Sequence, residues 1–282
     1  MPERRGLILW PRQGVQLRAI MLHSAQPKPL EMPVQFQFDT TRITVNLPDK
    51  AALVAAVQSR LRARQGFALA TINLDHLVKL RASATFRAAY SAQTMVVADG
   101  NPIVWLSRLA RRPVALLPGS DMVLPLARLA AQEGVPIALV GSSDASLAAA
   151  TAHLTNAIPG LAITLQIAPP YGFDPTGPAA DAILTQLQSA RIGLCFIALG
   201  APKQELFAAR GRSLAPDVGF ASVGAGLDFL GGAQARAPAW VRAIAMEWLW
   251  RALSSPRRMI PRYASCAAIL PGQMWAAWRL RP

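Results

Sequence analysis

Polar side chains stand just after five short apolar runs of the chain. When such runs form parallel strands, their carboxyl ends meet along one edge of a sheet, and ligands bind outside that edge. Hydroxyl, amide and carboxylate groups gathered there would bind a polar ligand and move a proton. The sequence therefore predicts a ligand site built from strand ends. The residues concerned are Thr71 and Asn73, Asp99, Ser142 and Ser143, Gln204, and Asp228.

Asp99 is the sharpest candidate for chemistry in this set. It follows the apolar run Thr94–Ala98 and precedes Gly100, so its carboxylate is expected to be partly desolvated. A carboxylate in such surroundings is suited to act as a general base. An Asp at this position could equally cap a helix that starts at Asn101-Pro102. The residue pattern alone leaves both interpretations open.

Gln204 and Asp228 each carry two interpretations as well. Gln204 belongs to Gly200–Glu205, where backbone amides at the start of a helix could face a phosphate. The same stretch also fits an ordinary helix start, with Pro202 near the first position and Glu205 in the first turn. The Asp228 carboxylate could accept hydrogen bonds from a nucleotide base or ribose, or it could cap a turn.

Several kinds of site are excluded or disfavoured. The three histidines show no metal-ligand spacing, and His76 is expected to be packed or solvated rather than catalytic. No Asp-x-Asp pair is present to hold a nucleotide diphosphate through a divalent cation. No serine lies in a G-x-S-x-G elbow, which argues against an α/β-hydrolase. Gly224-x-Gly226 lacks the third glycine of the dinucleotide fingerprint, which disfavours an enzyme that uses NAD(P).

The elements that position these residues alternate between apolar runs and helical patterns. A strand near Ile43–Val45 leads into an amphipathic helix at about 50–64, with Asp49 as its N-cap. Alternating strands and helices predict an α/β fold, with a mostly parallel, Rossmann-like sheet flanked by helices on both faces. The remaining predicted strands are Phe67–Thr71, Thr94–Ala98, Pro136–Val140, Ile163–Ile167, Ile192–Leu199 and Val218–Val223.

Three segments are expected along the chain. Residues 1–40 lack steady periodicity and carry Pro27, Pro29 and Pro33, so we expect a loosely ordered N-terminal arm. Residues 41–233 form the α/β catalytic domain, and residues 234–282 form a helical, basic C-terminal appendage. That appendage holds five of the seven tryptophans and eight arginines against the single carboxylate of Glu247. Tryptophan favours the membrane–water boundary and arginine pairs with lipid phosphates, so the appendage is expected to rest on an anionic membrane or to close over a phosphorylated substrate.

The composition supports a folded protein with phosphate-bearing partners. Of the 282 residues, 52% are hydrophobic and 16% charged, and the formal net charge is +14. Only four of the 29 basic residues are lysines, and arginine binds phosphate bidentately. Nucleic acid is disfavoured as a partner because the cations concentrate at the termini and no zinc-finger, RRM or helix-turn-helix pattern occurs. The two cysteines are expected to be buried thiols of a reducing compartment.

No apolar run reaches the ~18–20 residues that membrane spanning requires. The best late candidate, 265–278, is short and is expected to be broken at Pro271-Gly272. The N-terminal residues also make a poor signal peptide. The sequence thus predicts a soluble or monotopic protein. The apolar face of the appendage needs cover from lipid, from the core or from another subunit, which leaves a homo-oligomer open.

Seven short motifs occur in order: Thr71-Ile72-Asn73, Ala98-Asp99-Gly100, Gly119-Ser120-Asp121, Pro169-Pro170-Tyr171-Gly172, Gly200-Ala201-Pro202-Lys203-Gln204-Glu205, Glu247-Trp248-Leu249-Trp250-Arg251 and Pro256-Arg257-Arg258. In this order they resemble the WecG/TagA/CpsF family of bacterial glycosyltransferases. The resemblance runs from about residue 40 to residue 265. The fifth and sixth motifs are specific when they occur together.

The resemblance implies a metal-independent, inverting transfer of a sugar from a UDP-sugar to a polyprenyl-diphosphate-linked saccharide. The reaction would need no cofactor and would serve cell-surface polysaccharide synthesis. It would take place on the cytoplasmic, inner face of the cell membrane, where the protein would bind anionic lipids peripherally. Members use UDP-N-acetylmannosamine or its uronate, and some exopolysaccharide members transfer glucose. The expected donor is therefore a UDP-hexose or UDP-N-acetylhexosamine, and the sequence does not choose between them.

The resemblance also implies roles for individual residues. Asp99 would be the base that deprotonates the acceptor hydroxyl. Thr71, Asn73 and Gln204 would line the sugar and acceptor pocket, and Asp228 would lie in the nucleotide site. The appendage would swing onto the cleft and supply arginines to the diphosphate, and preorganised arginines would neutralise the departing UDP in place of a cation.

Two departures from the family pattern concern the diphosphate site. Where many relatives carry an arginine before Gly-x-Asp, this chain has Leu116-Leu117-Pro118. Pro261 replaces a basic residue of the usual Arg-Arg-x-x-Arg-Arg run. Diphosphate binding is therefore expected to depend on Arg251, Arg258 and Arg262. The alternative to an enzyme is a non-catalytic protein that binds anionic lipid or nucleic acid. Added salt would weaken that binding steeply.

Overall fold

The computed structural model describes residues 33–234, 237–238, 240–241, 244 and 246–281. Its centre is a six-stranded sheet in the order β4-β3-β8-β7-β5-β6, and every neighbouring pair is parallel. Each of the six apolar runs that the sequence predicted as a core strand overlaps one of these strands, and β3 and β5 each extend one residue past the predicted run. The strands are β3 (Phe67–Ile72), β4 (Met95–Ala98), β5 (Ile137–Gly141), β6 (Ile163–Ile167), β7 (Leu194–Ala198) and β8 (Gly219–Ser222).

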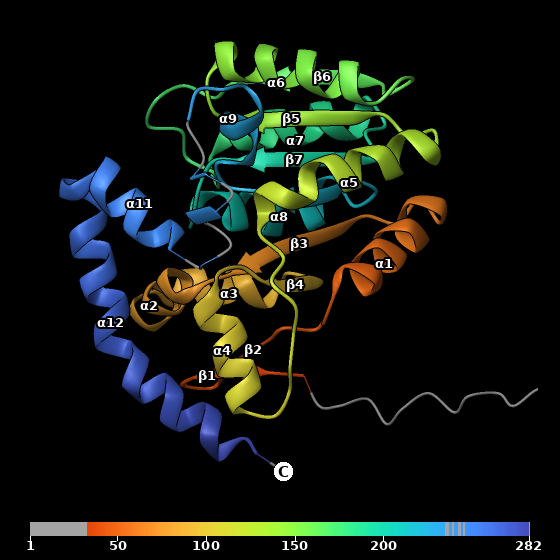
Figure 1. Cartoon of the computed structure of the whole chain (residues 1–282). Helices are drawn as coiled ribbons and strands as arrows, with labels where there is room; N and C mark the ends of the chain where they lie inside the picture. The colour runs from red at the N-terminus through yellow and green to blue at the C-terminus, as the bar shows by residue number, and fades with distance from the viewer. Residues whose placement is uncertain (1–32, 235–236, 239, 242–243, 245, 282) are drawn as a thin grey trace, which may run out of the picture. The chain divides into compact units, whose positions relative to one another are not determined.

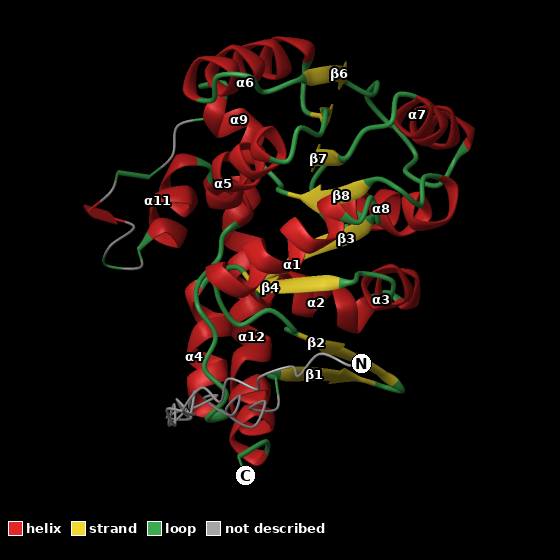
Figure 2. Cartoon of the chain, turned by 90° about the vertical axis from the view of Figure 1, so that its right-hand side faces the viewer, coloured by secondary structure: helices red, strands yellow, loops and turns green. Residues whose placement is uncertain are grey.

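Helices cover both faces of this sheet, which confirms the predicted α/β class (Figures 1 and 2). Alternate side chains of a strand point to opposite faces, and the buried clusters follow that alternation. Phe196 packs on one face with α1, α5 and α6, whereas Ile197 packs on the other with α7 and α8. The helices are α1 (Lys50–Arg62), α2 (Leu74–Ala82), α3 (Ala84–Ser91), α4 (Asn101–Leu109), α5 (Gly119–Gln132), α6 (Asp144–Ala157), α7 (Pro178–Ser189), α8 (Lys203–Leu214), α9 (Gly226–Leu230), α11 (Glu247–Ser254) and α12 (Pro256–Arg279).

The first helix begins where its cap predicts. The Asp49 side chain accepts a hydrogen bond of 2.8 Å from the backbone amide of Ala52, so the expected N-cap of α1 is confirmed. The helix ends at Arg62, two residues before the expected end. Ala63 is its C-cap residue, and the positive φ of 50° at Arg64 is incompatible with a continued right-handed helix.

A two-stranded antiparallel hairpin precedes α1 and corrects, from Gln35 onward, the prediction of a loose arm over residues 1–40. Strand β1 (Gln35–Phe38) pairs with β2 (Thr41–Thr44), the strand expected near Ile43–Val45. The hairpin is ordered because Phe36, Phe38 and Ile43 bury their side chains in one apolar cluster with α2, α3 and α4. The rest of the expected arm, residues 1–32, lies outside the described residues.

Among its described residues, the C-terminal appendage includes the helices α11 and α12. Helix α12 packs against α2 and α4 and buries Met259, Cys266 and Ala277 (Figure 1). Pro271-Gly272, expected to break this segment, lies inside the helix, as does Pro261. Proline removes one helical hydrogen bond, and the packing of α12 on the core stabilises the turns on either side. Within the described ranges, no helix combines the length and the apolar character that crossing a bilayer would require.

Candidate active site at the carboxyl edge of the sheet

Thr71 and Asp99 meet because their strands are neighbours. Strands β3 and β4 pair in parallel with Ile72 opposite Ala98, so Asp99 emerges beside the end of β3. The Asp99 amide donates to the Ile72 carbonyl at 2.8 Å, which fixes the backbone at this point. The Thr71 hydroxyl then donates to Asp99 Oδ2 at 3.4 Å. The sheet register thus places a hydroxyl and a carboxylate together at the predicted ligand edge.

The surroundings of Asp99 suit a base rather than a helix cap. The N-cap residue of α4 is Gly100, and no side chain caps that helix, which removes the capping interpretation. Burial raises the pKa of the Asp99 carboxyl to about 6, against the lowering effect of the Arg251 guanidinium. Glu247 raises the pKa further, and the Thr71 hydrogen bond lowers it. A carboxyl with this pKa is largely ionised at neutral pH and can accept a proton.

Asn73 stabilises the start of α2 at the same edge. Its side-chain oxygen accepts a hydrogen bond of 3.1 Å from the His76 amide and so caps α2. Two residues earlier, the Thr71 carbonyl accepts a hydrogen bond of 2.6 Å from the Tyr90 hydroxyl. These bonds hold the backbone of the first strand end, so its side chains are presented by a fixed turn.

The His76 side chain is packed in the interior, which is one of the two non-catalytic interpretations (packed or solvated) of this residue. Its ring lies against Phe86 and Tyr90, and its Nδ1 is 3.3 Å from the Tyr90 hydroxyl. Burial lowers the pKa of His76 to about 4, so the imidazole is neutral at physiological pH. It stabilises the turn under Thr71 rather than facing a ligand.

Gln204 joins two strand ends from the start of α8. Its side-chain oxygen accepts from the Gly224 amide at 3.1 Å, and its side-chain nitrogen donates to Glu205 Oε1 at 2.8 Å. The amide orientation is therefore set by protein groups before any ligand arrives. Lys203, by contrast, donates to the Phe173 carbonyl at 2.8 Å, away from the Gln204 side chain's partners.

Glu205 is a member of this site that sequence reasoning missed. The pattern suggested a first-turn acid that complements the helix dipole, but the side chain is fully buried. Burial raises the pKa of Glu205 to about 7, partly offset by the hydrogen bond from Gln204. A signal was present in the sequence, because a carboxylate that follows a strand and precedes Leu206-Phe207 stands in an apolar context.

Asp228 is engaged on both carboxylate oxygens. Ser142, from the end of β5, donates to Oδ1, and the Gln234 side chain donates to Oδ2 at 3.0 Å. Asp228 lies within the short helix α9, and its hydrogen bonds connect this helix to two other segments. It therefore does not act as the cap of a turn. Both carboxylate oxygens of Asp228 thus accept hydrogen bonds from side chains of the protein.

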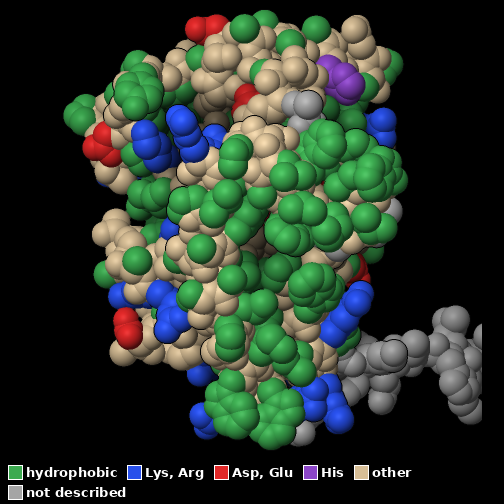
Figure 3. Space-filling view, turned by 60° about the vertical axis from the view of Figure 1, so that its left-hand side comes forward, with side chains coloured by type: hydrophobic (Ala, Val, Ile, Leu, Met, Phe, Trp, Pro, Cys, Tyr) green, Lys and Arg blue, Asp and Glu red, His purple; other side chains and the backbone are tan. Residues whose placement is uncertain are grey.

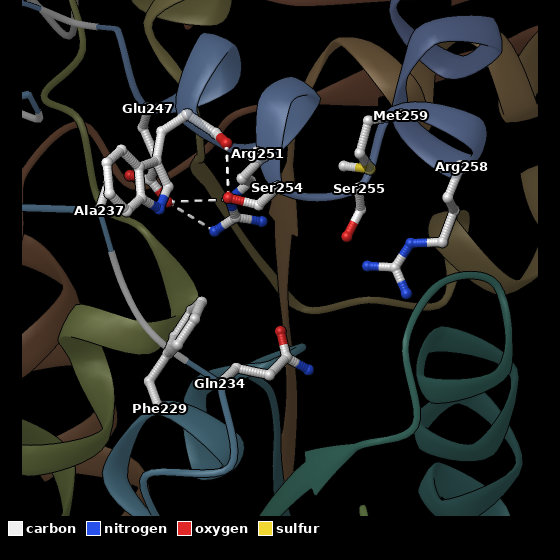
Figure 4. A pocket seen from close by; sticks show the side chains of 10 residues that line it. Phe229, Gln234, Ala237, Glu247, Arg251, Ser254, Ser255, Arg258 and Met259 are labelled. Carbon is white, nitrogen blue, oxygen red and sulfur yellow. Dashed lines mark hydrogen bonds and ion pairs between the residues drawn. The ribbon is translucent and has the colours of Figure 1, made fainter.

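A pocket of about 240 Å³ lies between the appendage and the segment after β8. Figure 4 shows Phe229 and Gln234 on one side of it, facing Arg251 and Arg258. The Arg251 guanidinium bonds to Glu247 at 2.6 Å and lies 5.5 Å from the centre of the Phe229 ring. The other lining residues are Ala237, Glu247, Trp250, Ser254, Ser255 and Met259.

Arg262 does not share this pocket. Its guanidinium pairs with Asp75 on α2 at 2.9 Å, and it is not among the lining residues. Of the three arginines expected at the diphosphate, the structure brings together Arg251 and Arg258. Arg262 stands one turn beyond Arg258, roughly 6 Å further along the axis of α12, and there it pairs with α2.

The segment with Leu116-Leu117-Pro118 also reaches the site. The Leu117 amide donates to the Ala98 carbonyl at 2.8 Å, next to Asp99, and its side chain is buried. Leu116 is 39% exposed and supplies no charge here. The start of α5 brings Asp121 near enough to raise the pKa of Asp99.

Within the described part of the chain, no group of three or more His, Cys, Asp and Glu side chains is placed to hold a metal ion. The prediction of metal independence concerns the reaction and stays a prediction.

The family comparison covers nearly the whole chain. The profile of the glycosyl transferase WecG/TagA/CpsF family matches residues 38–281, a range that contains the sheet, the strand-end residues and the appendage. The motifs that carry the resemblance lie at the ends of the strands and in the helices beside them. The chain belongs to the WecG/TagA/CpsF family of glycosyltransferases.

Proposed function

We propose that this glycosyltransferase moves a hexose or N-acetylhexosamine from a UDP-sugar to a polyprenyl-diphosphate-linked saccharide, with inversion and without a metal ion. The observation that carries the proposal is the position of Asp99. Its pKa is raised to about 6 by burial, and it lies within the electrostatic reach of Arg251 at the ligand edge of the sheet. A base within the electrostatic influence of a cation suits proton removal from one substrate and charge neutralisation on the other.

The proposed reaction is a single displacement. Asp99 accepts the proton of the acceptor hydroxyl while the hydroxyl oxygen forms a bond to the anomeric carbon of the donor. The bond between that carbon and the β-phosphate oxygen breaks, and UDP departs with the electron pair. Attack from the face opposite the leaving group inverts the configuration. Thr71 and Gln204 line the sugar and acceptor side, together with Asn73, whose oxygen also caps α2.

Arg251 and Arg258 are proposed to bind the diphosphate. Both line the pocket of about 240 Å³, which is smaller than the ~300–1,000 Å³ of typical small-molecule sites. It would therefore take part of the nucleotide rather than the whole donor. Asp228 would hold the nucleoside, with its Ser142 and Gln234 contacts replaced by ligand hydroxyl groups.

The transfer assay uses labelled UDP-sugars and a synthetic sugar-diphosphate-lipid, with EDTA present. The variants are wild type, Asp99→Asn and, as a matched control, Asp144→Asn, because Asp144 is exposed at the start of α6. Wild type and the control are expected to transfer the sugar of one of the UDP-sugars to the acceptor. Asp99→Asn is expected to lose this transfer while still binding UDP. Equal transfer by Asp99→Asn would overturn the role of Asp99. A wild type that neither transfers nor binds UDP would support the non-catalytic lipid-binding alternative.

The appendage is proposed to rest on the anionic inner face of the cell membrane. The side of the molecule that bears it comes forward in Figure 3, where hydrophobic side chains gather and Lys and Arg side chains flank them. Trp275 and Trp278 are exposed, with ring centres 5.3 Å apart. Tryptophan and arginine together favour the headgroup region. The other exposed large hydrophobic residues of α4, α11 and α12 are Trp105, Trp248, Trp250, Leu253, Ile260 and Met274.

Vesicle sedimentation tests this second part of the proposal. The double variant Trp275→Ala/Trp278→Ala is expected to bind anionic vesicles more weakly than wild type. Tyr171→Ala is the control, because Tyr171 is fully exposed in the loop before α7. Unchanged vesicle binding by the double variant would contradict the assignment of this surface.

A further inference from the structure

One carboxylate of the core binds a cation from the appendage and a cation from its own helix. Asp75 lies in the first turn of α2, and its side chain is 12% exposed. Its Oδ2 is 2.7 Å from the Lys79 ammonium and 2.9 Å from the Arg262 guanidinium of α12. Burial favours the neutral acid, but the two cations outweigh it and hold the pKa of Asp75 below its ordinary value. The carboxylate is therefore charged and shared.

Lys79 also contacts the loop before α8. Besides Asp75, its ammonium donates to the carbonyl of Ala201 at 3.1 Å. Ala201 lies three residues before Gln204, whose backbone amide donates to Gly200 at 3.0 Å. The Gln204 side chain is in turn fixed by Gly224 and by its neighbour Glu205. Polar contacts thus run from α12 through α2 to the Ala201 carbonyl, and the backbone connects Ala201 to Gln204 at the ligand edge.

The series differs from an exposed surface salt bridge. Such pairs contribute little because water screens both partners. Here the carboxylate is mostly enclosed, so the loss of Arg262 leaves it with Lys79 alone of these two cations. With Arg262 gone, the less neutralised Asp75 carboxylate would attract the Lys79 ammonium more strongly, at the expense of the longer hydrogen bond of 3.1 Å to the Ala201 carbonyl.

We propose that Asp75 is a positioning residue that couples the docking of α12 to the placement of Gln204. When Arg262 is paired, Lys79 is shared between Asp75 and the Ala201 carbonyl, and the loop before α8 is held for substrate. When α12 leaves, the loop loses part of that support. Arg262 acts in this arrangement through Asp75 and not on the diphosphate. The inference rests on the proposed function only in the statement that Gln204 touches substrate.

The competing explanation is a local contact without consequence for the loop. Helix α12 also buries Cys266 and Ala277 against the core, and these apolar contacts alone would keep it docked. On that explanation, the loss of Arg262 changes only α12 and its immediate surroundings.

Hydrogen exchange on the full chain, without substrate or vesicles, separates the two explanations. The reporters are the amides of Gln204 and Leu206, which donate to Gly200 and Pro202 at the start of α8. Arg262→Ala is expected to speed their exchange about 2- to 30-fold, the range of ordinary coupling between sites. Arg262→Lys is expected to restore most of the protection. Arg257→Ala, which removes an exposed arginine of the same helix, is the control and leaves these amides unchanged.

The coupling must also pass through Asp75. In an Asp75→Asn background, Arg262→Ala is expected to have no further effect on the two amides. If Asp75→Asn does not fold, the Lys79→Met background provides the same comparison. Faster exchange confined to 256–266 in Arg262→Ala would overturn the inference. A steady-state assay completes the test, with Arg262→Ala expected to raise the KM for the sugar donor or acceptor while leaving UDP affinity unchanged. Loss of UDP affinity in Arg262→Ala would instead return Arg262 to the diphosphate.

The two proposals fail in different ways. Coupled exchange without sugar transfer by wild type would contradict the glycosyl transfer and leave the coupling intact. Sugar transfer with uncoupled exchange would contradict only the role of Asp75.

Discussion

The Thr71 hydroxyl donates a hydrogen bond of 3.4 Å to the Asp99 carboxylate across the neighbouring strands β3 and β4. This bond favours the charged carboxylate, whereas burial favours the neutral acid and dominates, so the pKa lies at about 6. The balance leaves Asp99 mostly ionised at neutral pH and still basic enough to take a proton. Four predictions follow from this geometry and from the packing around it.

Replacement of Asp99 by Asn should abolish most transfer and stabilise the fold. Loss of a general base typically lowers kcat by about 10²–10⁴-fold. The neutral amide also removes the cost of keeping a buried carboxylate charged, which a pKa of about 6 places at roughly 1–3 kcal/mol at neutral pH. Kinetics and thermal melts of the same preparation measure both effects. A lower melting temperature together with full activity would contradict the assignment.

The acid limb of the pH profile should report Asp99. Its folded pKa of about 6 lies above the ordinary value of 3.8, so the folded state binds a proton more tightly than the unfolded state. The value of kcat/KM should therefore rise with pH up to about 6 and then level off. The stability gain of Asp99→Asn should be small at pH 4 and complete above pH 6. A gain that is largest at pH 4 would have the wrong sign for this carboxylate.

Glu247 and Arg251 should shift that profile in opposite directions. Glu247 raises the pKa of Asp99 and Arg251 lowers it, although the two side chains are paired with each other. Glu247→Gln is expected to move the acid limb to lower pH, and Arg251→Ala to higher pH. Arg251→Ala should also cost roughly 2–4 kcal/mol of transition-state stabilisation, as measured for other preorganised donors. Profiles that move in the same direction would show that the appendage does not act on Asp99 as the structure indicates.

Two glycines should respond oppositely to substitution by alanine. A Cβ at Gly219 in β8 would lie 2.3 Å from the Phe67 ring, inside the core, so Gly219→Ala should destabilise by about 1–3 kcal/mol. A Cβ at Gly272 in α12 would meet no atom within 4 Å. Gly272→Ala should therefore stabilise by up to about 1 kcal/mol, since alanine restricts the unfolded chain and favours helix. Urea unfolding of the two variants measures both changes, and equal signs would contradict this packing.

Local pattern was enough to predict most of the fold. Apolar runs such as Phe67–Thr71 and Ile192–Leu199 are recognisable as strands because parallel strands buried on both faces need apolar side chains there. Asp49 was recognised as a cap because its partner, Ala52, is only three residues away. The same local reasoning was wrong at Gln35–Phe38, where order depends on the packing of Phe36 and Phe38 against helices distant in sequence.

The sequence by itself determined the α/β class, the strand-end position of Asp99 and the family, because these depend on short apolar runs and contiguous motifs. Only the tertiary structure decided how side chains from separate elements pair. It placed Arg251 near Asp99, Arg262 on Asp75 and Glu205 in full burial. Such pairings depend on how α11 and α12 dock on the core, and that docking is set by apolar contacts such as those of Cys266 and Ala277, which no local pattern near Asp75 or Asp99 encodes.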